Sequence, residues 1–157
     1  PAAGIGLIAI DVVKFFRGER YISKAIDNLA FGTYNSHFKN ENDPIAWLTK
    51  DKNQKKKYAA DPYCTFKLTV SAMHDLVTLN KKANRATWFQ NIKMPVLLVS
   101  GADDPVGNYG KGVTKVYEKL KKAGCNVQLK LYENCRHEIL NDTCRDEVVR
   151  DIENFIA

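Results

Sequence analysis

The chain has 157 residues, and its 24 Lys and Arg against 18 Asp and Glu give a formal net charge of +6. Hydrophobic residues make up 45% and charged residues 27%, which is typical of a globular protein and excludes a disordered or fibrous chain. The longest apolar run, residues 5–16, contains Asp11 and Lys14 and falls short of the ~20 apolar residues that a membrane-spanning helix needs.

The first predicted element is a helix over residues 5–16, with Gly18 as its C-terminal stop. Its polar stripe is narrow and consists of Asp11, Lys14 and Arg17. Such a helix is either buried on most sides or leaves an apolar face for a ligand or lipid. We favour burial, because most apolar helices serve to pack a core.

Three further helix signals follow in the first half of the chain. Ser23 is a candidate N-cap of a short helix, and Asp43-Pro44 has the pattern of a helix start that leads into Trp47 and Leu48. Apolar residues at spacings of three and four predict a longer helix over residues 65–80. No strand signal of comparable quality precedes residue 94, so this half is predicted to be helical.

Five lysines gather in residues 50–57. A charge run of this kind is typical of a solvated loop or helix face. No aromatic residues alternate with the charges and no nucleic-acid-binding module is recognisable, so we expect no nucleic-acid partner. Peripheral contact with an anionic membrane surface is the second interpretation.

The second half predicts alternating strands and helices. The continuous apolar run over residues 96–99 predicts a strand buried on both faces of a parallel sheet, and the alternation over 127–131 predicts a second strand nearer an edge. A helix over 112–123, stopped by Gly124, lies between them, and a last helix covers 146–156. This β-α-β unit followed by a helix indicates an α/β fold with parallel strands and a crossover helix.

The four cysteines, Cys64, Cys125, Cys135 and Cys144, form no Cys-x-x-Cys pair. A chain of this size does not need disulfides, so we expect reduced thiols in a cytoplasmic protein, with a Cys135–Cys144 disulfide as the alternative. The sequence shows no signal peptide, and its start at Pro1 rather than Met is compatible with removal of a preceding segment. No set of His, Cys, Asp and Glu has metal-ligand spacing, and we expect neither a metal nor another cofactor.

Polar side chains follow both predicted strands. Residues 101–107 come after the first strand and include two adjacent aspartates, and residues 132–138 come after the second and include His137. Because adjacent parallel strands lie about 5 Å apart, a carboxylate at one strand end can meet an imidazole at the next. Such a carboxylate orients the imidazole as in a nucleophilic triad. The alternative is a loop aspartate and a surface histidine near Glu138.

Two segments carry a family resemblance: Pro95 to Gly107, which reads PVLLVSGADDPVG, and Arg136 to Asn141, which reads RHEILN. With Leu131-Tyr132 before the second, they resemble the last third of α/β-hydrolases of the monoacylglycerol lipase and lysophospholipase type. In that family the acid of the triad stands three residues after the strand-end glycine, and the histidine follows the next strand. The resemblance implies Asp104 as the acid and His137 as the base, with Asp103 as the competitor for the acid.

The first half is similar to the helical cap that these enzymes insert before those strands. The matching landmarks are residues 31–35, which read FGTYN, together with Trp47-Leu48 and Asp61-Pro62. The resemblance therefore implies a cap region over residues 1–87 and the C-terminal part of an α/β-hydrolase core over residues 88–157.

One departure from the family concerns the nucleophile. The family places its serine in Gly-x-Ser-x-Gly, and none of Ser23, Ser36, Ser71 and Ser100 lies in such a setting. The loop that forms the oxyanion hole is also absent. We therefore expect the chain to be the C-terminal part of a serine hydrolase, to lack its nucleophile, which lies upstream, and to be inactive alone.

The resemblance implies cleavage of carboxylic esters of lipid-like substrates, either monoacylglycerols or lysophospholipids. The alternative is a non-catalytic lipid-binding or interaction domain derived from a hydrolase. The apolar strand over residues 96–99 needs neighbours, so we expect pairing with the N-terminal part of the same hydrolase or with a second copy. The two other histidines, His37 and His74, are interpreted as a solvated loop residue and a helix-boundary residue.

Overall fold

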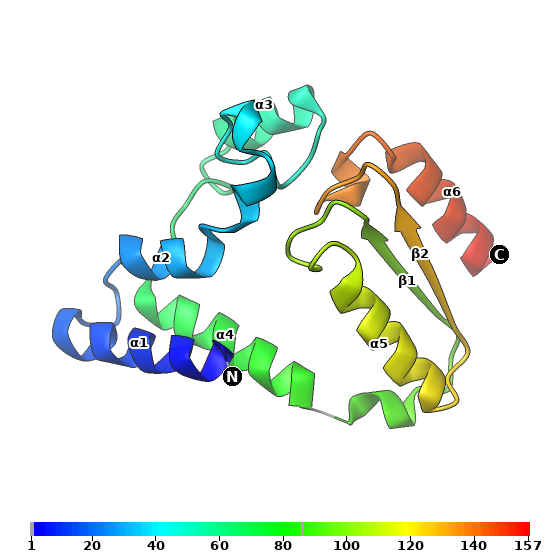
Figure 1. Ribbon diagram of the computed structural model, residues 1–157, viewed down its shortest axis with the longest axis horizontal. Helices are drawn as coiled ribbons and strands as arrows, with labels where there is room; N and C mark the ends of the chain where they lie inside the picture. The colour runs from blue at the N-terminus through cyan, green and yellow to red at the C-terminus, as the bar shows by residue number, and fades with distance from the viewer. Residues whose placement is uncertain (1, 86) are drawn as a thin grey trace. The chain divides into compact units, whose positions relative to one another are not determined.

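The computed structural model describes residues 2–85 and 87–157 (Figure 1). Contacts divide the chain into two compact units. The helical unit comprises residues 1–33 and 62–87, and the strand unit comprises residues 34–61 and 88–157. Residues 34–61, which the sequence analysis assigned to the cap, thus make their contacts with the segment that carries the strands.

The helical unit contains α1 (Ala2–Arg17), α2 (Lys24–Phe31) and α4 (Val70–Arg85), and α1 packs against α4. The predicted signals at the ends of α1 and α2 are confirmed. Gly18 adopts a positive φ of 85° directly after α1, and the Ser23 side chain accepts the Ile26 N–H at 3.3 Å. Four buried residues form the core of this unit: Ile10, Ile26, Val70 and Met73.

The predicted helix over residues 65–80 is shifted along the chain. It begins at Val70, and the Thr69 hydroxyl accepts the Ala72 N–H at 3.2 Å, as a capping side chain does. Apolar spacing located the buried stripe, but this side-chain cap decides where the helix begins.

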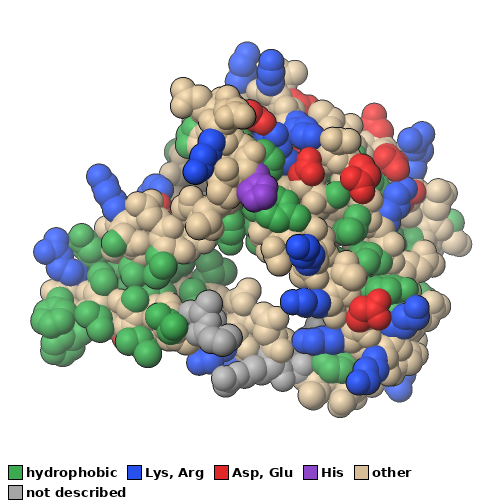
Figure 2. Space-filling model, in the orientation of Figure 1, with side chains coloured by type: hydrophobic (Ala, Val, Ile, Leu, Met, Phe, Trp, Pro, Cys, Tyr) green, Lys and Arg blue, Asp and Glu red, His purple; other side chains and the backbone are tan. Residues whose placement is uncertain are grey.

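The expected burial of α1 on most sides is wrong. Ile10 is buried, yet Phe15 is 83% exposed and Phe16 is 75% exposed, and Ile5, Ile8 and Val12 are exposed as well. Figure 2 shows hydrophobic side chains gathered at the surface over α1. Because α4 and α2 cover only part of α1, an apolar face of this helix remains open. Among the described residues, no helix has the length and apolarity needed to cross a membrane.

The strand unit is built on two parallel strands, β1 (Val96–Gly101) and β2 (Val127–Tyr132), which pair from Val96 with Val127 to Gly101 with Tyr132. The α5 helix (Lys111–Lys122) connects them and α6 (Arg145–Ile156) follows (Figure 1), which confirms the predicted α/β unit. The first four residues of β1 are half-buried, so the prediction of a strand buried on both faces is wrong for the described residues. The buried core of this unit consists of Tyr132, Cys135 and Val148.

Five shorter elements complete the strand unit: η1 (Tyr34–His37), η2 (Lys39–Glu41), α3 (Lys52–Ala60), η3 (Trp88–Asn91) and η4 (Ile139–Asn141).

The predicted helix start at Asp43-Pro44 is wrong, because residues 44–48 form turns. The Asp43 carboxylate accepts the Ile45 N–H at 3.0 Å, which closes a local turn instead of capping a helix. The next helix is α3, which Asp51 caps through the N–H groups of Asn53 and Gln54. The lysine run therefore lies mainly on a short helix, where Lys52, Lys56 and Lys57 are exposed as expected, whereas Lys55 is half-buried and forms ion pairs with Glu41 and Asp43.

The loop after β2 crosses the end of β1 at Gly101. A Cβ atom at this position would overlap the carbonyl oxygens of Cys135 and Arg136. Only glycine permits this approach of the two backbones.

We therefore expect Gly101→Ala to lower the free energy of unfolding of the strand unit by at least about 2 kcal/mol, because the loop after β2 must move away from β1. Gly6→Ala in α1, where a Cβ atom meets nothing within 4 Å, is the control and should leave stability unchanged or slightly raised. Urea unfolding followed by circular dichroism measures both changes. Equal stability of the Gly101→Ala variant and the parent chain would contradict the inferred close approach.

Candidate active site

The loop that follows β1 holds the Asp104 carboxylate in a defined, buried position. Asp104 is only 6% exposed. Its Oδ1 accepts the Val106 N–H at 2.8 Å, and its backbone carbonyl accepts the Tyr109 N–H at 2.8 Å. A Cβ atom at Gly107 would lie 3.2 Å from Asp104 Oδ2, so the glycine leaves room for the carboxylate. Contacts within the loop thereby hold the Asp104 side chain in place.

Backbone hydrogen bonds join this loop to the loop that follows β2. The Ala102 N–H donates to the Tyr132 carbonyl and the Asp103 N–H donates to the Cys135 carbonyl, both at 2.9 Å. These bonds continue the β1–β2 pairing past the strand ends. They bring the segment that carries Asp104 against the segment that carries His137.

The structure brings Asp104 and His137 together, as the order of the two strands predicted. His137 Nδ1 lies 3.2 Å from both carboxylate oxygens of Asp104. Asp103 instead lies 3.3 Å from the Lys50 ammonium, so the competitor for the acid faces a different partner. The imidazole is oriented by one carboxylate and its side chain remains 38% exposed.

The pair has the electrostatics of an acid–base couple. The hydrogen bond that the imidazole donates to Asp104 raises the pKa of His137 above its ordinary value, and burial of the ring opposes this rise. A carboxylate at Nδ1 leaves Nε2 as the ring nitrogen that can exchange a proton with a reactant. Chemically, the arrangement can take a proton from a hydroxyl and stabilise the imidazolium that results.

A second segment, residues 45–50, supports His137 from another side. The His137 N–H donates to the Trp47 carbonyl at 3.4 Å, and the Glu138 N–H donates to the Leu48 carbonyl at 2.9 Å. The Trp47 ring lies with its centroid 5.3 Å from that of His137 and 5.1 Å from that of Tyr34. Burial and the negative charge of Asp104 raise the pKa of Tyr34. The Trp47 ring therefore lies beside the imidazole, and the Tyr34 ring packs against Trp47.

Asp142 was missed by the sequence analysis. Its buried carboxylate accepts three backbone N–H groups, those of Lys50 at 2.9 Å, Arg136 at 2.8 Å and Thr143 at 2.8 Å. It thus links residues 45–50 to both ends of the His137 loop, the segment 133–144 between β2 and α6. The Asn-Asp-Thr sequence is an ordinary loop signal, and nothing local to it points to Lys50, a partner 92 residues away.

The expectation of four reduced thiols is wrong, because Cys135 and Cys144 form a disulfide. The two residues are nine positions apart, and the His137 loop turns back at η4 so that their Cα atoms lie 6.3 Å from one another. Cys125 lies elsewhere, with its thiol 3.3 Å from the Phe89 carbonyl oxygen. The disulfide therefore closes the loop that carries His137.

The two other histidines have different neighbours. His37 is exposed, and its ring centroid is 4.5 Å from that of Tyr109. His74 belongs to the helical unit, where Nε2 lies 3.6 Å from an Asp11 oxygen and Nδ1 lies 3.5 Å from an Asp75 oxygen. Across residues 2–85 and 87–157, no group of three or more His, Cys, Asp or Glu is arranged to hold a metal ion.

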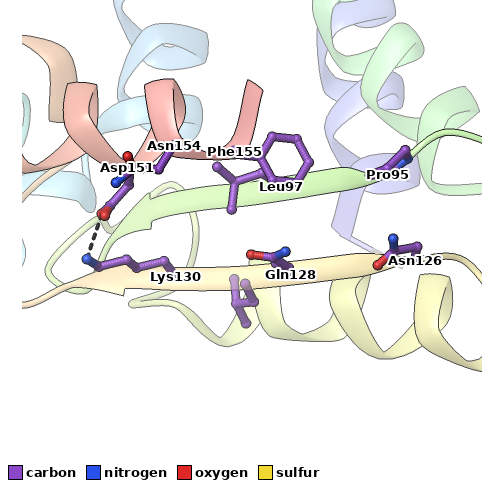
Figure 3. A pocket seen from close by; sticks show the side chains of 9 residues that line it. Pro95, Leu97, Asn126, Gln128, Lys130, Asp151, Asn154 and Phe155 are labelled. Atoms are coloured by element: carbon purple, nitrogen blue, oxygen red, sulfur yellow. Dashed lines mark ion pairs between the residues drawn. The ribbon is translucent and has the colours of Figure 1, made fainter. Parts of the chain in front are cut away.

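A cavity of about 540 Å³ opens between the strands and α6 (Figure 3). The Lys130 ammonium and the Asp151 carboxylate, 2.6 Å apart, form an ion pair in its wall, and Leu97 and Phe155 supply apolar surface. Neither Asp104 nor His137 lines this cavity. The acid–base pair, and not this cavity, is therefore the candidate active site.

Comparison with known proteins gives a family for the chain. The sequence profile of the family described as serine aminopeptidase, S33 matches residues 2–144. No curated protein matches the sequence significantly.

Solved structures give the fold. A thermostable carboxyl esterase from Bacillus coagulans in complex with glycerol is 26% identical, with a TM-score of 0.85 over 99% of this chain and 52% of that chain. A lipase in its open form is 22% identical, with a TM-score of 0.86 over 96% of this chain and 52% of that one. A monoglyceride lipase variant from Saccharomyces cerevisiae is 18% identical, with a TM-score of 0.55 over 96% and 57%. The chain thus spans about half the length of the structures it matches and has a partial α/β-hydrolase fold.

The contact between Asp104 and His137 predicts a measurable titration. We expect the imidazole of His137 to titrate above the ordinary value of about 6.5, and Asp104→Asn to lower its pKa, because the carboxylate favours the imidazolium. Asp103→Asn, the control, should leave the His137 pKa unchanged. NMR titration of the imidazole signals measures all three. A larger effect of Asp103→Asn would move the acid by one residue.

The raised pKa of His137 also predicts how the stability of the fold changes with pH. Because the folded-state pKa of His137 is raised, its contact with Asp104 stabilises the fold below the ordinary pKa, and this contribution is lost as pH rises through the raised value. In Asp104→Asn this part of the pH dependence should disappear from urea unfolding curves.

The disulfide predicts a thiol count. Titration of the denatured chain with a thiol reagent, without reductant, should find two reactive thiols, those of Cys64 and Cys125, and four after reduction. Cys144→Ser should lower the free energy of unfolding by about 3 kcal/mol, the value that loop-closure entropy gives for a loop of this length. Four thiols before reduction would contradict the disulfide.

Proposed function

Because the chain belongs to the serine aminopeptidase, S33 family of hydrolases, we propose that Asp104 and His137 are the acid and the base of a Ser–His–Asp triad. The observation that carries this proposal is the position of His137 Nδ1, 3.2 Å from both oxygens of a buried carboxylate. The reaction is hydrolysis of carboxylic esters, and the substrates are lipid-like: monoacylglycerols or lysophospholipids.

In this mechanism His137 Nε2 takes the proton of a serine hydroxyl as that oxygen attacks the ester carbonyl. Nδ1–H donates to Asp104, whose charge stabilises the imidazolium. The imidazolium then returns the proton to the leaving alcohol, and a second cycle with water releases the acid. Each step uses the same proton path between Nε2 and the reacting oxygen.

The serine itself lies upstream of this chain in our proposal. Ser100, the serine closest in sequence to Asp104, is buried and its hydroxyl donates to the Gly101 carbonyl at 3.3 Å. It lacks the Gly-x-Ser-x-Gly context that exposes a nucleophile on a sharp turn. A hydrolase with about twice this length, like the matched structures, would supply the serine and the oxyanion hole.

The lipid-like substrate class rests on three observations. The carboxyl esterase at 26% identity was solved with glycerol, and a monoglyceride lipase shares the fold. The Trp47 ring lies beside the imidazole and the Tyr34 ring packs against Trp47, and this aromatic surface favours an apolar acyl group over a charged one. The family description also names an aminopeptidase, so amide substrates belong in the test.

The proposed partners are those that would cover the unpaired edge of β1 and the exposed face of α1. Among the described residues β1 pairs with β2 alone, so we propose that its other edge pairs with the N-terminal part of the same hydrolase or with a second copy. The exposed face of α1, with Phe15 and Phe16, supports peripheral membrane contact. We keep residues 1–87 as the cap region of the whole enzyme and 88–157 as part of its core.

The same α1 face favours a second candidate function, a lipid-binding domain without catalysis. Both candidates predict binding to phospholipid vesicles. They differ in that the catalytic candidate requires Asp104 and His137 for turnover by the longer protein.

The test compares this chain, the longer protein, and variants of the longer protein at equal concentration. We expect no measurable hydrolysis of p-nitrophenyl esters or monoacylglycerols by the 157-residue chain, which has neither nucleophile nor oxyanion hole. In the longer protein, His137→Ala and Asp104→Asn should lower kcat/KM on the order of 10³- to 10⁴-fold. Turnover should rise with pH through the pKa of His137, because the base must be neutral.

His37→Ala is the matched control, since His37 is an exposed histidine of the same unit, and it should retain activity. Turnover by the short chain that survives His137→Ala would place the catalytic centre elsewhere. Preference of the longer protein for aminoacyl anilides over monoacylglycerols would overturn the ester assignment.

A further inference from the structure

Arg136, the residue before His137, is a buried cation, only 4% exposed. Its guanidinium contacts Glu41 through both terminal nitrogens, Nη2 to Oε1 and Nη1 to Oε2, the second at 3.1 Å. Nη1 also donates to the Ala46 carbonyl at 2.5 Å, and the guanidinium carbon lies 4.1 Å from the centroid of the Phe38 ring. The polar and aromatic contacts of this guanidinium thus come from residues 38–46, about 90 positions earlier.

The pairing is strong enough to change the ionisation of its partner. The hydrogen bond from Arg136 lowers the pKa of Glu41 to about 2, and the Lys55 ammonium, 3.1 Å from Glu41, contributes to the decrease. Glu41 itself is about 40% exposed at its side chain, so water reaches one side of the pair. The guanidinium is held by a carboxylate that stays ionised at any ordinary pH.

The contacts next to this ion pair reach His137. Directly after Ala46, the Trp47 carbonyl accepts the His137 N–H and the Leu48 carbonyl accepts the Glu138 N–H. The Trp47 ring then lies beside the imidazole. Residues 41–48 therefore contact the His137 loop at three consecutive positions, 136, 137 and 138.

A purely stabilising role explains this arrangement poorly. A buried ion pair is weak support for stability, because the cost of removing both charges from water offsets much of their attraction. A planar guanidinium that binds two carboxylate oxygens and a carbonyl does, however, fix the direction of the segment that carries those acceptors. Because Arg136 directly precedes the proposed base, a fixed direction of this segment also fixes the surroundings of His137.

We propose that Arg136 and Glu41 are positioning residues for His137: by clamping residues 38–46 onto the His137 loop, they hold Trp47 beside the imidazole and keep Nδ1 against Asp104. Neither residue touches the imidazole, and both act through Trp47 and the backbone of residues 137 and 138. The catalytic consequence rests on the proposed function, whereas the placement of the ring does not.

The first test uses the chain itself and needs no activity. Glu41→Gln removes the charge at a partly exposed position, and Arg136→Lys keeps the charge but loses the planar fork. In both variants we expect the NMR-measured pKa of His137 to fall toward its ordinary value, and the nuclear Overhauser contacts between the Trp47 and His137 rings to weaken. Asp151→Asn is the control, since it breaks an ion pair and a tyrosine hydrogen bond in the same unit, and should change neither signal.

An unchanged His137 pKa together with unchanged Trp47–His137 contacts in folded Glu41→Gln would overturn the proposal. Should Arg136→Lys fail to fold, Glu41→Gln decides the matter alone, because its side chain keeps the shape of glutamate. A pKa change in Asp151→Asn equal to that in Glu41→Gln would also overturn it, by showing a general response to lost stability.

The second test uses the longer hydrolase. Glu41→Gln should lower kcat roughly 10- to 100-fold with little change in KM, and should move the rise of the pH–rate profile to lower pH. Asp151→Asn should do neither. If the longer protein has no esterase activity but the NMR titration changes as expected, the proposed function fails and the positioning role stands. If activity is present but Glu41→Gln leaves kcat and the pH profile intact, the positioning role fails.

Discussion

The candidate site depends on one close approach, that of the loop after β2 to the end of β1 at Gly101. Parallel pairing places the ends of both strands at one edge, but side-chain contact there requires the two following loops to touch as well. The absence of a side chain at Gly101 permits this contact, and the N–H groups of Ala102 and Asp103 then bind carbonyls of the second loop. The meeting of Asp104 and His137 follows from this backbone arrangement.

Much of this arrangement could be predicted because its signals are local. Strand β1 is a short apolar run between Pro95 and Gly101, and α5 and α6 have amphipathic spacing, so each was found within about two residues. The order strand, acid, helix, strand, histidine then fixes which side chains share an edge. The order of the elements does not distinguish Asp103 from Asp104, because both follow β1 and only the directions of their side chains differ. The family resemblance selected Asp104.

Residues 43–50 could not be predicted in the same way. Asp-Pro is found both at helix starts and in turns, and here Asp43 closes a turn through the Ile45 N–H. The Trp47 and Leu48 carbonyls accept hydrogen bonds from residues 137 and 138, and the Lys50 N–H donates to Asp142. Long-range partners therefore use backbone groups that a helix would have satisfied locally. Nothing near Asp43 in the sequence reveals those partners.

Two other expectations were wrong: the burial of α1 and the reduced state of all four cysteines. The apolar content of α1 indicated burial, but α4 and α2 cover only part of its surface, and Phe15 remains exposed. The spacing of Cys135 and Cys144 fits no short motif, and only the turn at η4 brings them together. The disulfide also removes the cysteine argument for a reducing compartment, so a cytoplasmic location stays a prediction without that support.

The residues that contact Asp104 and His137 belong to one of the two units of the chain. The contacts described for Asp104 and His137 are made by residues 34–61 and 88–157, which form a single unit. In the positioning role that we propose, residues 34–61 act on the imidazole through Trp47 and Glu41, so a segment about 90 residues earlier in the sequence sets the direction of the ring.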